Sequence, residues 1–158
     1  MSTFRFPLEK VLELRKHQEQ AAALRLAEAQ REAERARRAL DALEELRRQG
    51  RDRLAQAHGA GGLAGHLQNL RYLVDRLGQL VADANAVTRA ADERVSAMLA
   101  ELSVALQERR IIDRLRERSL DEWRAEQARA EQKLMDDVAG ERHERNAANQ
   151  AREVSEPL

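Results

Sequence analysis

Apolar residues recur at alternating spacings of three and four along two long stretches of this chain. This alternation lines up apolar side chains along one stripe of an α-helix, as in coiled coils. In the second stretch it continues over roughly six heptads, and a strict seven-residue repeat predicts a left-handed supercoil. The stripes consist of Leu26, Ala29, Ala33, Ala36, Leu40 and Leu43, and of Leu67, Leu70, Val74, Leu77, Val81, Ala84, Thr88, Ala91, Val95, Met98, Leu102 and Ala105.

The pattern weakens toward both ends of the chain. Leu8, Val11 and Leu12 start a stripe that Arg15 and Gln18 interrupt, so we expect the first helix to fray more easily. Near the carboxyl end the apolar positions become sparse, although helix-forming residues continue. We expect a first helix over residues 4–57, a second over 67–145, and a disordered tail over 146–158.

Four of the seven glycines fall in one short segment between the stripes, "HGAGGLAGH" at residues 58–66. This segment fits the loose dinucleotide-binding pattern through Gly59, Gly61 and Ala64, but that motif requires a preceding strand, and no strand pattern occurs here. Glycine accepts positive φ and commonly ends helices, so we interpret residues 58–66 as a turn. The predicted fold is all-α: two long helices in one antiparallel coiled-coil hairpin, with residues 1–158 as a single domain.

The composition fits long helices better than a globular enzyme. Aromatic residues make up 3% of the chain and charged residues 35%, and there is no cysteine. A two-helix hairpin offers no enclosed pocket in which catalytic groups converge. The four histidines, none spaced as a metal-binding pair, are His17, His58, His66 and His143. We therefore expect no enzymatic activity, no cofactor and no metal site.

The charges balance overall but are unevenly distributed. The chain has 28 basic and 28 acidic residues, which disfavours nucleic acid as a partner. Residues 109–118 contain five arginines, and residues 121–141 lean acidic. This change of sign is either a docking site for a protein or an ordinary solvated helix face. No segment is apolar enough to span a bilayer or act as a secretory signal, so we expect a cytoplasmic protein without direct membrane insertion.

Two regions carry apolar residues that a two-stranded seam does not account for. Near the turn, the chain has more large apolar residues than one seam can bury. This excess either thickens the local core or presents a contact surface. These residues include Leu43, Leu46, Tyr72, Leu73, Leu77 and Leu80. Trp123, the only tryptophan, is either a partner anchor or a cap on the helix pair.

Three segments resemble the FliJ-type proteins of the bacterial flagellar type III export apparatus. The opening "FRFPLEKVLELRKHQEQAA" is similar to the start of that family, and the glycine-bearing turn falls where the family turns. The closing "RAEQARAEQKLMDDVAGERHER" is similar to the family's last segment, with Glu131, Gln132 and Lys133 before an acidic pair and an arginine-rich end. The resemblance covers nearly the whole chain.

The resemblance implies a non-catalytic stalk that serves flagellum assembly, and so motility and chemotaxis. Its implied partners are the hexameric export ATPase, which it stimulates, the cytoplasmic domain of the export gate protein, and substrate chaperones. It also implies a location at the inner-membrane export apparatus. The ATPase contact would fall on Leu8, Val11, Leu12, Gln132, Lys133, Asp136 and Arg142. The gate contact would fall on Leu43, Leu46, Leu73, Leu77 and Leu80.

Two other functions remain open at this point. The sequence is also compatible with the equivalent stalk protein of a virulence injectisome. A self-associating coiled-coil scaffold that binds no ATPase is the other alternative.

Overall fold

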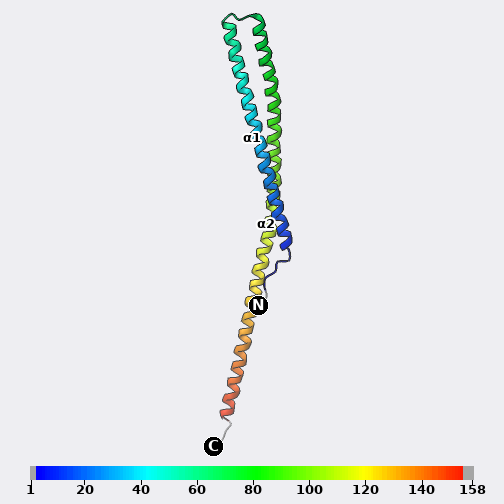
Figure 1. Cartoon of the computed structure of the whole chain (residues 1–158). Coiled ribbons are helices and arrows are strands. Elements are labelled where there is room, and N and C mark those ends of the chain that lie inside the picture. The colour runs from blue at the N-terminus through cyan, green and yellow to red at the C-terminus, as the bar shows by residue number, and fades with distance from the viewer. Residues whose placement is uncertain (1–2, 155–158) are drawn as a thin grey trace. The chain divides into compact units, whose positions relative to one another are not determined.

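The chain folds into two long α-helices joined by a short turn (Figure 1). The structure, a computed structural model, describes the backbone of residues 3–154 and the side chains of residues 3–150. The helices are α1 (Glu9–Gly59) and α2 (Ala64–Val154), and the described residues contain no strand. The predicted all-α fold with two packed helices is confirmed.

The first helix begins later than expected, at Glu9 rather than at residue 4. Pro7 explains the difference, because the ring of a proline disfavours helical geometry at the residue before it. The chain therefore turns at Pro7 and Leu8, and the amide of Leu12 donates the first regular helical bond, at 2.9 Å, to the carbonyl of Leu8.

One glycine carries the reversal of the chain. Gly61 has a φ of 69°, the left-handed conformation that glycine adopts without strain. The amide of Gly62 donates to the carbonyl of Ala57 at 2.9 Å, and that of Gly61 donates to the carbonyl of His58 at 3.3 Å. These two bonds form a Schellman motif, which satisfies the last carbonyls of α1. The glycine segment ends a helix, as predicted, although the non-helical part is only residues 60–63.

The second helix extends well past residue 145, where the sequence suggested an end. It reaches Val154, so the prediction of disorder over residues 146–158 is wrong as far as residue 154, and residues 155–158 lie outside the described part. Alanine, glutamine, glutamate and arginine make up six of the nine residues 146–154, and each has a high intrinsic helix propensity. A helix needs no packed stripe to continue where most residues favour it.

The contacts within the chain divide it into two compact units. One, here the hairpin unit, comprises residues 13–109; the other, here the terminal unit, comprises residues 1–12 and 110–158. The treatment of residues 1–158 as a single domain stays a prediction.

In the hairpin unit, α1 and α2 run antiparallel and side by side (Figure 1). Ion pairs join early residues of α1 to late residues of α2: Arg15 to Glu108 at 2.6 Å and Arg25 to Glu101 at 3.4 Å. Every position of the two long stripes predicted over residues 26–43 and 67–105 is buried or half-buried. Within the hairpin unit, the most deeply buried apolar side chains of α1 are those of Ala22, Ala29 and Ala33, each at most 2% exposed. Small side chains at the seam allow the two helix axes to approach closely.

Arg15 does not interrupt this seam but belongs to it. The three-four alternation runs through Arg15, Glu19, Ala22 and Leu26, and Arg109 holds the matching seam position on α2. Arg15 pairs with Glu108, and Glu19 pairs with Arg109, whose side chains are only 25% and 26% exposed. The sequence shows the two charges on α1, but only the fold shows the opposite charges across from them.

The terminal unit holds the residues before α1 against α2. Phe6 and Leu12 are buried, and the ring of Phe4 lies 6.0 Å from that of Trp123 at a tilt of 58°. Such tilted aromatic pairs contribute about 0.5–1.5 kcal/mol beyond the area they bury. The packing of Trp123 against Phe4 supports its interpretation as a cap.

The seam ion pairs predict a clear outcome for charge reversal. Glu19→Arg places a second cation beside Arg109, so we expect a loss of about 1–2 kcal/mol in the free energy of unfolding. The double exchange Glu19→Arg/Arg109→Glu should restore most of that loss. Urea unfolding followed by circular dichroism measures both; equal losses in the two variants would contradict the pairing.

The single tryptophan reports on the terminal unit. Phe4→Ala removes the ring that covers Trp123, so the fluorescence maximum should move to longer wavelength and quenching by acrylamide should increase. Thr3→Ala, a change at an exposed neighbour, serves as the control. An unchanged spectrum in Phe4→Ala would show that the two rings do not pack in solution.

Candidate interaction surfaces

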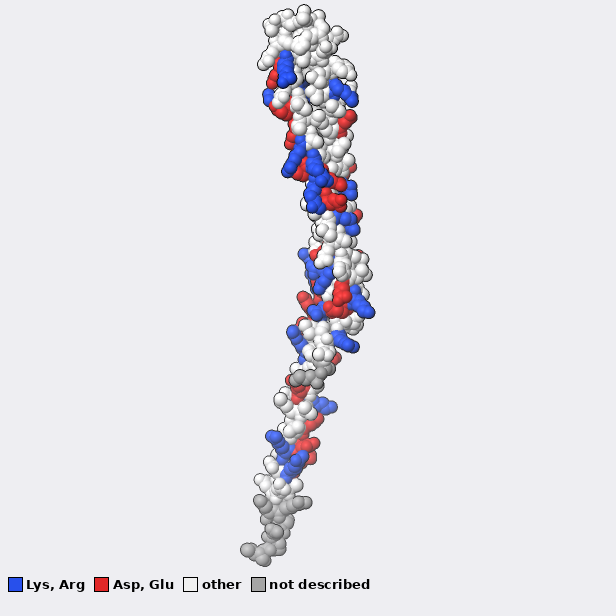
Figure 2. Space-filling model, in the orientation of Figure 1, with Lys and Arg blue, Asp and Glu red and all other residues white. Residues whose placement is uncertain are grey.

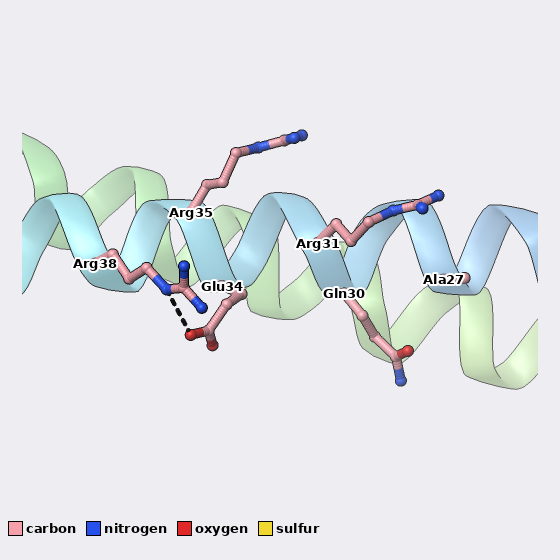
Figure 3. A pocket seen from close by; sticks show the side chains of 6 residues that line it. All are labelled: Ala27, Gln30, Arg31, Glu34, Arg35 and Arg38. Atoms are coloured by element: carbon pink, nitrogen blue, oxygen red, sulfur yellow. Dashed lines mark hydrogen bonds and ion pairs between the residues drawn. The ribbon is translucent and has the colours of Figure 1, made fainter.

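The hollows of this molecule are open grooves between side chains rather than enclosed pockets. Figure 3 shows one that is lined along α1 by Ala27, Gln30, Arg31, Glu34, Arg35 and Arg38. Its one internal contact is a hydrogen bond of 3.0 Å from Nε of Arg38 to Glu34, one turn earlier on the same helix. This groove is open to solvent.

The described residues contain neither a candidate metal site nor a candidate membrane-spanning segment. No group of three or more histidine or acidic side chains there is placed to hold a metal ion. His58 and His66, at the two ends of the turn, are both exposed. Within the same part of the chain, neither helix has a stretch that is long and apolar enough to cross a membrane.

Two of the five arginines in the basic stretch at residues 109–118 form ion pairs within the chain. Arg109 pairs with Glu19 in the hairpin unit, and Arg116 pairs with Glu9 at 3.2 Å in the terminal unit. Arginines that are already paired with carboxylates contribute little to binding an external anion. The stretch thus stabilises packing, a role that sequence analysis did not consider.

One side of the hairpin unit is defined by two ion pairs. Arg25 pairs with Glu101, and one heptad further along α1, Glu32 pairs with Arg94 at 3.1 Å. In an antiparallel pair, a step of seven forward on one helix and seven back on the other returns to the same side. Continuing this series toward the turn places Ala39 opposite Val87, Leu46 opposite Leu80, and Arg53 opposite Leu73.

Nearer the turn, the same side is therefore mostly apolar rather than ion-paired, with Arg53 as its one charged position. We call Ala39, Leu46, Leu73, Leu80 and Val87 the apolar flank. Val87 is 60% exposed, Leu46 50% and Leu73 48%, although equivalent positions further from the turn carry ion pairs. Large apolar side chains left open at a regular spacing mark a contact surface for another chain.

The five residues predicted for the gate contact fall into two groups. Leu43 and Leu77 are half-buried seam residues, whereas Leu46 and Leu73 are open on the apolar flank and Leu80 lies half-buried between them. Sequence analysis missed Val87, although the spacing of seven from Leu73 to Leu80 to Val87 was a signal for it.

The turn itself is free of formal charge. Residues 54–70 contain no lysine, arginine, aspartate or glutamate, and the corresponding end of the molecule is uncoloured in Figure 2. Leu63 in the turn is 83% exposed, and Tyr72 in the next turns of α2 is 74% exposed. The uncharged turn and the apolar flank together leave this end of the hairpin unit with little charge to keep a partner away.

A second open apolar surface lies in the terminal unit, on the last third of α2. We call Leu134, Met135, Val138 and Ala139 the carboxy-terminal face. Leu134 is 66% exposed, Met135 68% and Val138 44%, and the groove they line continues to Arg142 and His143. The spacings of four from 134 to 138 and from 135 to 139 put these side chains on one side of the helix. The sparse apolar positions near the carboxyl end did not predict this surface.

The structure separates the residues predicted for the ATPase contact. Gln132, Lys133, Asp136 and Arg142 are exposed around the carboxy-terminal face, where Gln132 donates to Asp136 at 2.9 Å. Leu8 and Val11 are partly exposed, at 38% and 37%, and Leu12 is buried at 2% and so serves packing. Arg116, which pairs with Glu9 near Leu8, precedes Gln132 by about 24 Å of helix at 1.5 Å per residue. The amino-terminal and carboxy-terminal groups therefore form two patches rather than one.

One carboxylate near the turn has a strongly shifted pKa. Arg48 donates two hydrogen bonds to Glu45, at 2.7 and 2.9 Å, and lowers the pKa of this carboxyl to about 2, with help from Gln49. Glu45 and Arg48 therefore form an ion pair in which both side chains are ionised at every physiological pH.

Two long helices with open apolar surfaces are typical of proteins that bind other proteins. The family model described as "Flagellar FliJ protein" matches residues 4–148. The chain belongs to the flagellar FliJ protein family, and with it to the components of type III protein export.

Among solved structures, the fold is similar to one described as a "putative YscO homolog CT670" from Chlamydia trachomatis. The TM-score is 0.64 and the identity 19%, with 92% of this chain and 99% of that chain covered. At this identity the likeness shows the fold alone. No curated protein matches the sequence.

A pair of substitutions tests the assignment of the apolar flank. Ala39→Glu/Val87→Arg should extend the series of ion pairs by one heptad, so the free energy of unfolding should change by no more than about 0.5 kcal/mol. Binding of a hydrophobic dye should decrease, and the single change Val87→Arg is the control. A loss above about 1.5 kcal/mol in the pair would contradict the shared side.

Proposed function

We propose that this chain is a stalk-like, non-catalytic component of the flagellar export apparatus. It binds and stimulates the hexameric export ATPase, contacts the cytoplasmic domain of the export gate protein, and escorts substrate chaperones. The family match over residues 4–148 supports this role. The location that follows is the cytoplasmic side of the inner membrane, at the export apparatus.

The observation that carries the proposal is that each of the two units bears an open apolar surface. The hairpin unit carries the apolar flank and the terminal unit carries the carboxy-terminal face, and acidic and basic side chains lie in patches along the rest of the visible face (Figure 2). A protein with a single partner needs one such surface, whereas a connecting protein needs two.

The carboxy-terminal face is the proposed contact for the ATPase. Leu134, Met135 and Val138 supply an apolar centre, and the exposed polar residues Gln132, Lys133, Asp136 and Arg142 form its rim. An apolar centre within a polar rim is the common arrangement of protein interfaces. A lone helix without a second helix covering it is also narrow enough to enter the centre of a ring. Leu8 and Val11 form a smaller second patch.

The apolar flank is the proposed contact for the gate protein. Leu46, Leu73, Leu80 and Val87 supply the contact area, and the half-buried seam residues Leu43 and Leu77 support them from behind. Because the family model that matches the chain is a flagellar one, we favour a role in flagellar export over a role in an injectisome. In the scaffold alternative, a second copy of the chain would cover the apolar flank instead.

A crossed experiment tests both contacts. Leu134→Gln/Val138→Gln should abolish most of the stimulation of the cognate export ATPase, measured at about one chain per hexamer, and leave the affinity for the gate domain unchanged. Ala39→Glu/Val87→Arg should do the reverse, weakening gate binding roughly tenfold. Each variant is thus the control for the other, because each must retain one activity.

Two results would contradict the proposal. The absence of any stimulation by the wild-type chain would exclude the ATPase contact. A stable homodimer in light scattering that Ala39→Glu/Val87→Arg converts to monomer would show that the apolar flank serves self-association.

A further inference from the structure

One charged seam residue of the hairpin unit lacks the partner that the others have. The seam of α1 passes through Leu43, Arg47 and Gly50, so Arg47 holds a position that elsewhere is apolar or ion-paired. Arg15 and Glu19 pair across the seam, but Arg47 has no ion pair or hydrogen bond among the described residues. Its Nε is shielded from solvent and has no acceptor.

The space for this arginine is provided by a glycine on the facing helix. A Cβ at Gly78 would lie 3.4 Å from one Nη and 3.5 Å from Nε of Arg47, so the guanidinium lies flat against the backbone of α2. A buried donor without an acceptor costs about 1–3 kcal/mol, and an unpaired charge costs more. An apolar seam residue would avoid this cost, so the position calls for an explanation other than stability.

The groove around Arg47 favours an anion with one charge. It has a volume of about 290 Å³ and is lined by Glu44, Arg47, Arg48, Arg51, Asp52 and Val81. Arg48 forms ion pairs with Glu45 at 2.7 Å and with Asp52 at 3.2 Å. Arg47 and Arg51, one helical turn apart, have no carboxylate partner among the described residues. Glu44 and Asp52 would repel a doubly charged phosphate more strongly than a carboxylate.

The groove lies away from the apolar flank. The ion pair between Arg37 and Asp92 lies on the other side of the hairpin unit. Steps of seven along α1 lead from Arg37 to Glu44 and then to Arg51, and two steps of seven back along α2 lead from Asp92 to Gly78, opposite Arg51. A partner on the apolar flank therefore leaves this groove open. The volume is below that of typical small-molecule pockets, which suits a side chain better than a metabolite.

We infer that Arg47 and Arg51 form a binding site for the carboxylate of an acidic side chain on a protein that docks on this side of the hairpin. The planar guanidinium fork matches a carboxylate in two parallel hydrogen bonds. The incoming carboxylate supplies the ion-pair partner that Arg47 lacks in the free chain. Docking thereby removes the free-energy cost of the unpaired charge and so favours the complex. An ion pair already formed within the free chain would leave no such gain for docking.

The full-length chain, labelled with nitrogen-15 at arginine, provides a direct test. The Nε–H signal of Arg47 is assigned by its loss in Arg47→Met. Sodium acetate, added at constant ionic strength against sodium chloride, should shift this signal in a saturating manner. A hexaglutamate peptide should give the same shift at lower concentration, and the signal of Arg35, on the outer side of α1, should stay in place.

Stability supplies the second readout. Arg47→Met keeps the side-chain length and the helix propensity, so removing the unpaired charge should raise the melting temperature by roughly 2–4 °C. Arg35→Met should leave it unchanged. An Arg47 signal that moves no more than that of Arg35, or that responds more strongly to phosphate than to acetate, would overturn the inference. A lower melting temperature in Arg47→Met would overturn it as well.

Discussion

The close approach of two antiparallel helices along an alanine-rich seam is the constraint on which the rest of this structure depends. Ala22, Ala29 and Ala33 bury little area each, so the seam gains close contact rather than bulk. Val74 on α2 faces Gly50 on α1, where a Cβ would lie 3.2 Å from Cγ2 of Val74. This complementarity fixes the register between the helices, and the register decides which outer residues share a side.

The function follows from what that register leaves uncovered. Cross-helix ion pairs occupy one side of the hairpin unit until Glu32 and Arg94, and apolar residues replace them nearer the turn. Exposed ion pairs add only a few tenths of a kcal/mol each, so exchanging them for leucine and valine costs little stability. The exchange creates a surface that another protein can cover. In the terminal unit, the carboxy-terminal face is the surface that another protein can cover. It lies on a part of α2 that stays helical through its own residue propensities, and no second helix buries it.

Much of the fold could be read from the sequence, since alternating spacings, an absence of internal proline and a glycine segment are all local signals. The seam residues from Leu67 to Ala105 and the reversal at the glycines follow from them directly. Arg15 could not be interpreted this way, because its partner Glu108 lies 93 residues away in the sequence. Val87 and the orphaned Arg47 also required the register, which no single helix reveals. Leu134 and Val138 are visible in the sequence, but their exposure depends on the absence of a facing helix, which the spacing alone does not show.

The measurement that tests the account most directly is disulfide formation in a chain that has no native cysteine. Gly50→Cys/Val74→Cys should form a disulfide within one chain on mild oxidation, seen as a faster monomer band on a non-reducing gel. Gly50→Cys/Val81→Cys, shifted by one heptad, should remain reduced. Disulfide-linked dimers, or equal oxidation of both pairs, would contradict the antiparallel register and, with it, the surfaces deduced from it.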